Sequence, residues 1–161
     1  TAEELGAERM LESGAGKGLT SIAFALARPQ ARITAIERDA ARAVAARANF
    51  AQFGVSDRID FLEGDAAEVL PCLQGPFDLI FLDAAKVQYR RFLPDCKRLL
   101  KEGGVLFSDD VLLFGHGVPP KRRLLAAHIA EYLDRLAADA DFTTEILHCG
   151  MGLAVSRKGK A

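Results

Sequence analysis

Paired cysteines, long apolar runs and an excess of charge of either sign are all missing from this sequence. Its three cysteines, Cys72, Cys96 and Cys149, stand far apart without a CxxC pair, which argues against a disulfide or zinc framework and suits a reducing, cytoplasmic setting. The longest apolar runs, such as 79–82 and 111–114, are far too short to span a bilayer. The net charge is −1, so no overall field draws the protein to a membrane or to nucleic acid.

Internal repeats, low-complexity tracts and Pro/Gly/Ser-rich linkers are also missing, so no domain boundary suggests itself. The first residues, Thr1–Glu4, are acidic, and no apolar segment of a signal peptide follows them. The length of 161 residues, half of them hydrophobic, fits one domain with one core. We therefore expect a single domain over residues 1–161. Because the chain begins with Thr rather than Met, we also expect an N-terminal piece to be short or missing.

What the sequence does contain is an alternation of short apolar runs with amphipathic stretches. Near-continuous apolar runs of strand length are typical of strands covered on both faces, as in parallel sheets. We expect strands at 9–13, 32–37, 58–63, 77–83, 104–109, 142–148 and 152–157, and helices at 17–27, 39–53, 66–73, 86–100 and 120–138. This order predicts an α/β fold with a doubly wound, mostly parallel seven-stranded sheet.

Two local features refine this prediction. Only Cys149–Met151 separates the last two expected strands, which is too short for a parallel crossover, so the last strand should pair antiparallel. Gly103-Gly104 is expected to stop the helix at 86–100. Ligands of such sheets bind beyond the carboxyl ends of the strands, near the point where the strand order reverses.

A glycine-rich loop, Glu12–Gly18, follows the first strand and opens the first helix. Glycine lets the backbone turn sharply and approach a ligand closely; the alternative is a simple tight turn between strand and helix. A phosphate-binding P-loop does not fit, because Gly18 rather than Ser or Thr follows Gly16-Lys17. A dinucleotide fingerprint is weakened, because Leu19 stands where its third glycine is required.

Two acidic residues follow the next two strands. Glu37 ends the second strand, where a carboxylate can accept both hydroxyls of an adenosine ribose. Asp65 follows the third strand and could accept from an adenine amino group. The alternatives are a solvated strand-end glutamate and an aspartate that caps a helix. Taken together with the glycine loop, the two residues favour a cofactor that contains adenosine.

A third group of acids follows the fourth and fifth strands. Asp83 ends one strand, and Asp109 and Asp110 end the other, so the three carboxylates should converge. Unpaired, they would raise one another's pKa, and a hard divalent cation such as Mg²⁺ would relieve the repulsion and leave positions open for a vicinal diol. Asp109 and Asp110 can share a metal only if the strand ends between them. The alternative for Asp110 is a turn-forming aspartate.

These motifs together resemble the cation-dependent O-methyltransferases, the catechol and caffeoyl-CoA O-methyltransferase-like enzymes. The resemblance rests on ExGxGxG followed by the segments 35–39, 63–66, 77–86 and 103–111, and it runs from Arg9 to Lys158. It implies a Rossmann-like domain that binds S-adenosylmethionine. The cofactor-binding residues are then expected to be Glu12, Gly14, Ala15, Gly16, Gly18, Glu37, Arg38, Asp65, Ala66 and Asp83.

The resemblance also implies the catalytic residues. Asp83 and Asp109 would be metal ligands, with Asp110 as the third, where the family usually carries Asn. Lys86 would be the general base that takes the hydroxyl proton. A lysine in the first turn of a helix is unfavourable against the helix dipole, so its presence asks for a reason; the alternative is an exposed lysine. Met151 is a departure, because the family commonly has an acidic residue there.

The leading hypothesis is therefore an enzyme that transfers a methyl group, with the help of Mg²⁺ or another divalent cation, to a hydroxyl of a small catechol-like phenol. A homodimer is what the family suggests. One alternative acceptor is a hydroxylated wobble uridine of tRNA, against which the net charge of −1 argues mildly. Another alternative is a cofactor-binding module without activity. An NAD-dependent reductase is disfavoured by the GxGxG loop.

Overall fold

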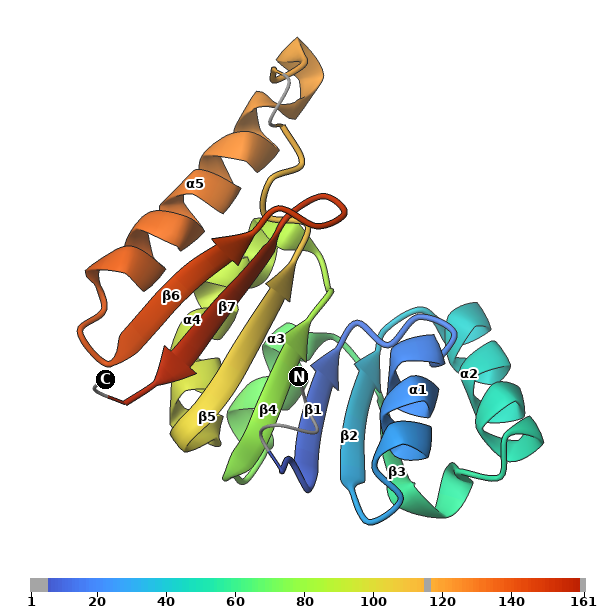
Figure 1. The fold of residues 1–161 in the computed structure, drawn as a ribbon. Coiled ribbons are helices and arrows are strands. Elements are labelled where there is room, and N and C mark those ends of the chain that lie inside the picture. The colour runs from blue at the N-terminus through green and yellow to red at the C-terminus, as the bar shows by residue number, and fades with distance from the viewer. Residues whose placement is uncertain (1–5, 115–116, 160–161) are drawn as a thin grey trace.

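The computed structural model describes residues 6–114 and 117–159, and these form one seven-stranded sheet with helices on both faces (Figure 1). The order of the strands across the sheet is β3-β2-β1-β4-β5-β7-β6. The strands are β1 (Arg9–Ser13), β2 (Arg32–Glu37), β3 (Ile59–Glu63), β4 (Phe77–Leu82), β5 (Leu100–Asp109), β6 (Phe142–Leu147) and β7 (Leu153–Lys158). The pairs β3–β2, β2–β1, β1–β4 and β4–β5 are parallel.

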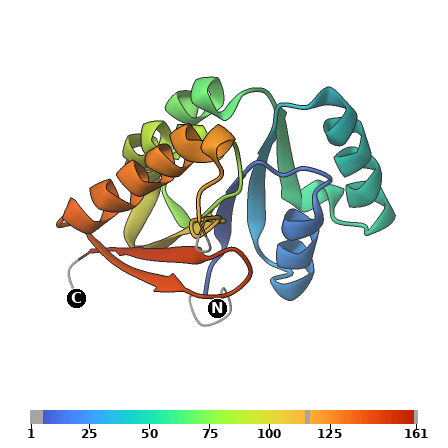
Figure 2. The same ribbon diagram turned by 90° about the horizontal axis from the view of Figure 1, so that it is seen from above.

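Five helices connect the strands. They are α1 (Leu19–Ala27), α2 (Ala40–Gln52), α3 (Ala66–Val69), α4 (Tyr89–Leu99) and α5 (Arg123–Ala138). Seen from above, α4 and α5 lie on one side of the sheet and α1 on the other (Figure 2). The core is divided in the same way, because successive residues of a strand point to opposite faces. In β4, for example, Leu79 belongs to the cluster with α1 and α2, whereas Ile80 and Leu82 belong to the cluster with α4 and α5.

The helix α4 shows how the pattern of the sequence produces the packing. Its buried residues Tyr89, Phe92, Cys96 and Leu99 recur every three or four positions, so they form one apolar stripe against the sheet. Burying a large apolar side chain contributes about 1.5–3 kcal/mol each. This helix and the 3₁₀ turn Lys86–Gln88 before it begin directly after the loop that follows β4. The packing of α4 therefore fixes the position of that loop.

The predicted fold class is confirmed. The strand β7 lies between β5 and β6 and is antiparallel to both, as the short connection before it required. All seven strands and five helices lie where the sequence placed them, with differences of a few residues at their ends. Among the helices of the described residues, none combines the length and the apolar character needed to cross a bilayer.

One predicted boundary is wrong. The helix α4 ends at Leu99, and β5 begins at Leu100, four residues before its expected start. The reason is tertiary, because Leu100 pairs with Phe77 of β4 and the register shifts between Phe77 and Leu79. Gly103-Gly104 therefore lies inside an irregular strand and does not stop the helix. Three expected helical stretches also contain 3₁₀ turns, at Leu70–Cys72, Lys86–Gln88 and Pro120–Arg122.

Candidate active site

The order in which the chain adds strands to the sheet reverses between β1 and β4. From β1 the chain proceeds to β2 and β3 on one side, and from β4 to β5 on the other, so the carboxyl ends of β1 and β4 flank a crevice. A cleft of about 560 Å³ lies there. Its lining includes nine of the ten predicted cofactor-binding residues, which are Glu12, Gly14, Ala15, Gly16, Glu37, Arg38, Asp65, Ala66 and Asp83. The tenth, Gly18, is not part of this lining.

The glycine loop closes tightly over the strand ends. The backbone N–H groups of Gly14 and Ala15 both donate to the Ile36 carbonyl oxygen at 2.9 Å. Gly14 has a φ of +94°, and a Cβ added to it would lie 2.6 Å from the carbonyl carbon of Asp83. Only glycine fits there without moving the end of β4. Gly18 is required for a different reason, since a Cβ would lie 2.7 Å from Cζ of Phe50 in α2.

Glu12 is buried at the floor of the cleft, with 1% of its surface exposed. The Ser21 hydroxyl of α1 donates a hydrogen bond to its Oε2. Burial raises the pKa of the Glu12 carboxyl to about 7, against the opposing effect of the hydrogen bonds from Ser21 and Thr20. The negative charge of Asp83 contributes to this increase. Burial thus disfavours the ionised form of Glu12.

Glu37 is not the solvated glutamate that was the alternative interpretation, because it is 5% exposed. Its Oε2 accepts from the backbone N–H of Gly16 at 2.7 Å, and its Oε1 accepts from that of Asp39 at 2.8 Å. These bonds fix the carboxylate at the rim of the glycine loop. A carboxylate has about four acceptor positions, so two remain for other donors in the cleft.

Asp65 has the capping role that the sequence left as one alternative, and it also lines the cleft. Its Oδ1 accepts from the backbone N–H of Ala67 at 2.9 Å, so it caps α3. Its Oδ2 lies 3.6 Å from Nη1 of Arg38, and both side chains line the cleft. The cap fixes the carboxylate at the end of β3, while its position in the lining keeps it accessible to a ligand.

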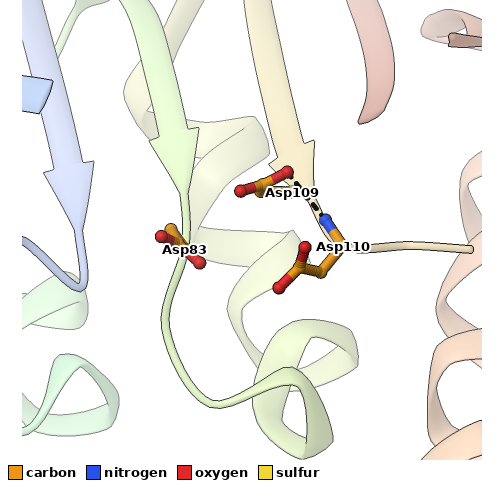
Figure 3. A group of neighbouring side chains, drawn as sticks. All are labelled: Asp83, Asp109 and Asp110. Atoms are coloured by element: carbon orange, nitrogen blue, oxygen red, sulfur yellow. Dashed lines mark hydrogen bonds between the residues drawn. The ribbon is translucent and has the colours of Figure 1, made fainter. Parts of the chain in front are cut away.

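The three acids Asp83, Asp109 and Asp110 do converge at the ends of β4 and β5 (Figure 3). One carboxylate oxygen from each lies within 4.8 Å of the other two. Asp109 and Asp110 could share a metal only if the strand ended between them. It does, because β5 ends at Asp109 and Asp110 has a φ of +59°. Asp110 is the one non-glycine residue with positive φ among the described residues. That left-handed turn brings the two consecutive carboxylates to the same side.

Hydrogen bonds hold this end of the sheet. The Asp109 Oδ1 accepts from the backbone N–H of Asp110 at 2.9 Å. The buried hydroxyl of Tyr89 lies 2.8 Å from the carbonyl oxygen of Leu82 and 3.3 Å from that of Asp109, so α4 ties β4 to β5. Burial raises the pKa of the Asp109 carboxyl, and the nearby charges of Asp110 and Asp83 raise it further. The charges of Asp83 and Asp110 therefore disfavour ionisation of Asp109.

Lys86 is neither exposed nor distant from this cluster. Its Nζ lies 2.6 Å from Asp83 Oδ1 and 3.1 Å from Asp110 Oδ2, and 14% of its side chain is exposed. Burial lowers the pKa of the Lys86 ammonium, but the hydrogen bonds and charges of Asp83 and Asp110 outweigh burial and raise the pKa above its usual value. The cluster is therefore partly neutralised by a lysine, which the sequence interpretation of three unpaired acids missed.

Several cleft residues escaped the sequence analysis. The cleft lining also includes Thr20, Arg42, Ala84, Ala85 and Gln88. The Ser21 hydroxyl, in addition, donates a hydrogen bond to Glu12. Thr20 and Ser21 lie on the first turn of α1, directly after the glycine loop. The signal that could have found them was their position directly after the glycine loop that lines the cleft.

The fold and the site together define a class, namely Rossmann-like domains with a cofactor cleft at the switch point and a cluster of acids beside it. Comparisons with known proteins make the assignment specific. The family model described as O-methyltransferase matches residues 3–159. The chain therefore belongs to the O-methyltransferase family, as the motifs indicated.

Individual relatives agree with this assignment. The catechol O-methyltransferase of Mycobacterium tuberculosis is 38% identical over 111 residues, which cover 68% of this chain and 50% of that protein. The caffeoyl-CoA O-methyltransferase of Populus kitakamiensis is 28% identical over 167 residues, covering 96% of this chain and 71% of the relative. The crystal structure of an SAH-bound methyltransferase of Podospora anserina superimposes with a TM-score of 0.90 at 26% identity, covering 99% of this chain and 75% of that one. The chain thus spans about half to three quarters of the length of these proteins.

Proposed function

We propose that the protein is an S-adenosylmethionine-dependent O-methyltransferase that acts, with a divalent metal ion, on a hydroxyl of a small catechol-like acceptor. One observation carries this proposal, namely the order of acidic side chains along the carboxyl edge of the sheet. Following the strand order, they are Asp65 after β3, Glu37 on β2, Glu12 on β1, Asp83 after β4 and Asp109 on β5. Neighbouring strands are about 4.8 Å apart. The acidic side chains therefore lie at similar intervals from the cofactor cleft to the acid cluster.

The two ends of the cleft suit the two ends of the donor. Glu37 has free acceptor positions for the ribose hydroxyls, and Asp65 lies one strand further for the adenine amino group. The methionine end then extends toward Glu12 and Asp83, because three strand spacings, roughly 14 Å, separate β3 from β4. Gly14, Gly16 and Asp83 all line the cleft that would hold this half of the donor. The SAH-bound relative supports this cofactor.

The acid cluster fits a hard divalent cation, since it offers three carboxylate oxygens and no nitrogen or sulfur ligand. Asp83, Asp109 and Asp110 are the residues that would hold it. When bound, such a cation supplies positive charge that lowers the pKa of a coordinated hydroxyl. Because Asp110 stands where the family usually has Asn, the cluster has three carboxylates, whose three negative charges face the single positive charge of Lys86. The site therefore has a net charge of about −2 in the absence of a metal ion, which matches a divalent cation.

The reaction needs a base for the acceptor proton, and Lys86 is the residue placed for it. The acceptor oxygen attacks the methyl carbon, the bond from carbon to the sulfonium sulfur breaks, and S-adenosylhomocysteine leaves as the thioether. Asp83 and Asp110 hold Lys86 beside the cluster as an ammonium, so it would first have to release a proton to solvent. A divalent cation held by the same carboxylates would favour that release by lowering the pKa of Lys86, and the resulting amine would then take the hydroxyl proton. These two carboxylates then stabilise the ammonium that forms.

A small phenol is the acceptor that the relatives support, because their names specify catechol and caffeoyl-CoA O-methyltransferases. The tRNA acceptor keeps the same chemistry, but a net charge of −1 gives it little support. A homodimer and a cytoplasmic location stay predictions from the sequence.

A methyl-transfer assay with labelled S-adenosylmethionine tests the proposal against a panel of catechols and bulk tRNA in parallel. We expect transfer to at least one catechol that stops on metal removal and returns with Mg²⁺. Asp109→Asn should lower the rate by about 100-fold or more, whereas Asp134→Asn, the same change at an exposed position on α5, should not change it.

The other outcomes decide between the alternatives. Transfer to tRNA alone would favour the wobble-uridine acceptor. Binding of S-adenosylmethionine without transfer to any acceptor would favour a binding module. Binding of NAD in place of S-adenosylmethionine would contradict the proposal altogether.

A further inference from the structure

A second cavity lies at the edge of the sheet opposite to the cofactor cleft. The neighbouring parallel strands β3, β2, β1 and β4 all begin at this edge, which is the lower edge of the sheet in Figure 1. The cavity has a volume of about 390 Å³, and it shares no lining residue with the cofactor cleft. Its lining includes Arg9, Arg32, Thr34, Asp57, Asp60 and Phe77.

Two arginines of this cavity begin neighbouring strands. Arg9 on β1 is the register partner of Arg32 on β2. Residues two or four positions apart in a strand share a face, and Leu11 and Ile36 belong to the core cluster of α4 and α5. Arg9, Arg32 and Thr34 therefore lie on that face of the sheet. Like charges at paired positions are destabilising, so this pair of arginines favours an anion beside it.

The two guanidinium groups extend in opposite directions and leave space between them. Arg9 reaches toward β4, where its Cζ lies 5.0 Å from the centre of the Phe77 ring. Arg32 reaches toward β3, where its Nη1 donates to the backbone carbonyl oxygen of Asp57. Within residues 6–114 and 117–159, neither guanidinium forms an ion pair with a carboxylate. Because a guanidinium has five N–H donors, most of the donors of this pair are available to a ligand.

The lining of the cavity carries more positive than negative charge. Arg58 is its third arginine, and Nη1 of Arg58 donates to the carbonyl oxygens of Ala25 and Pro29. Asp57 and Asp60 are its two acids, and both are exposed. The three arginines therefore exceed the two aspartates by one positive charge, and this balance favours an anionic ligand.

We propose that this cavity binds the phosphate group of a small phosphate monoester that also carries hydroxyl groups. The guanidinium groups of Arg9 and Arg32 approach the space between them from two sides. That arrangement suits the several oxygens of a tetrahedral phosphate better than the two oxygens of a planar carboxylate. The Thr34 hydroxyl, which also lines the cavity, is a further donor.

The rest of the ligand follows from the size and polarity of the cavity. A volume of about 390 Å³ lies in the range of small-molecule pockets and exceeds what a phosphate ion alone would fill. Asp57 and Asp60 are acceptors for hydroxyl groups of such a ligand. The site is independent of the proposed methyl transfer, because β1 separates Arg9 from Ser13 at the cofactor cleft by roughly 13 Å.

An NMR titration of the ¹⁵N-labelled protein with glycerol 3-phosphate, and separately with inorganic phosphate, tests the site. We expect saturable shifts that are largest at the amides of Ile33 and Thr34 and at the side-chain N–H groups of the two arginines, with tighter binding of the monoester. Arg9→Gln and Arg32→Gln should each weaken binding by about tenfold or more, because each removes charge-assisted hydrogen bonds. Arg91→Gln, the same change at an exposed position on α4, should leave the affinity unchanged.

Both cavity arginines are exposed, so either variant suffices if the other does not fold. No saturable binding of either phosphate at millimolar concentration would overturn the inference, as would an affinity that neither substitution lowers. Binding of malonate without binding of phosphate would overturn the choice of a phosphate group. Tighter binding of inorganic phosphate than of glycerol 3-phosphate would overturn the assignment to a monoester.

Discussion

Two alanine substitutions in the glycine loop differ sharply in their expected cost. Gly14 and Gly16 both have positive φ, at +94° and +58°, so alanine is strained at either position. That strain costs about 1–2 kcal/mol. A Cβ at Gly16 meets nothing within 4 Å, whereas a Cβ at Gly14 collides with the main chain of Asp83 and Ala84. Main-chain atoms at the end of a central strand cannot move aside as a flexible side chain can.

The collision adds an overpacking cost of about 1–3 kcal/mol at Gly14. We therefore expect Gly16→Ala to lower the free energy of unfolding by about 1–2 kcal/mol and Gly14→Ala to lower it by about 2–5 kcal/mol. For a chain of this size, each kcal/mol shifts the melting temperature by about 2–4 °C. Because the collision displaces Asp83, Gly14→Ala should also weaken binding of the donor and of the metal.

Urea unfolding of the two variants and the wild type measures the difference, provided that the slopes with denaturant are the same. Calorimetry with S-adenosylhomocysteine measures the loss of donor binding. Gly16→Ala is the matched control, since it has the same substitution in the same loop without the collision. Equal destabilisation by the two substitutions, within about 0.5 kcal/mol, would refute the reasoning.

Three further predictions concern stability and the metal. Tyr132→Phe removes the partner of the buried Ser108 hydroxyl, 2.5 Å away, and should lower the free energy of unfolding by about 1–3 kcal/mol in urea titrations. Burial opposes ionisation of Asp78, but the ammonium of Lys101 and two backbone N–H groups outweigh burial and lower the pKa of the Asp78 carboxyl. The ionised carboxyl therefore stabilises the fold at any pH above its pKa in the unfolded chain. This contribution is lost as the pH falls through the lower pKa of the folded protein. The stability difference between wild type and Asp78→Asn should accordingly be largest near pH 7 and shrink below about pH 3.8; a difference that grows at low pH would contradict the sign. Lys86→Met removes a positive charge from the acid cluster and should raise the affinity for Mn²⁺ by about tenfold or more in calorimetry, whereas an unchanged affinity would mean that the lysine does not compete with the metal.

Most of the fold could be predicted from the sequence, because its determinants are local. Apolar runs such as 77–82 mark buried strands, and the periodic stripe of α4 marks a helix over a sheet. The start of β5 could not be predicted, since Leu100 becomes a strand residue only by pairing with Phe77, far away in the sequence. Local propensity carries no information about such a partner.

The candidate site divides in the same way. Glu37 and Asp83 could be found because each ends a strand, and strand ends meet at one edge of a parallel sheet. The left-handed turn at Asp110 was needed for the acids to converge, but two consecutive aspartates do not reveal it. The pairing of Lys86 with two acids depends on rotamers and packing, which the sequence pattern does not contain.

The most direct test is a crystal structure of the protein with S-adenosylhomocysteine and Mn²⁺, with anomalous diffraction to locate the metal. Our account predicts one strong manganese peak among the carboxylates of Asp83, Asp109 and Asp110, and adenosine bound at Glu37 and Asp65. A manganese peak elsewhere, or a nucleoside outside the cleft above the glycine loop, would contradict it.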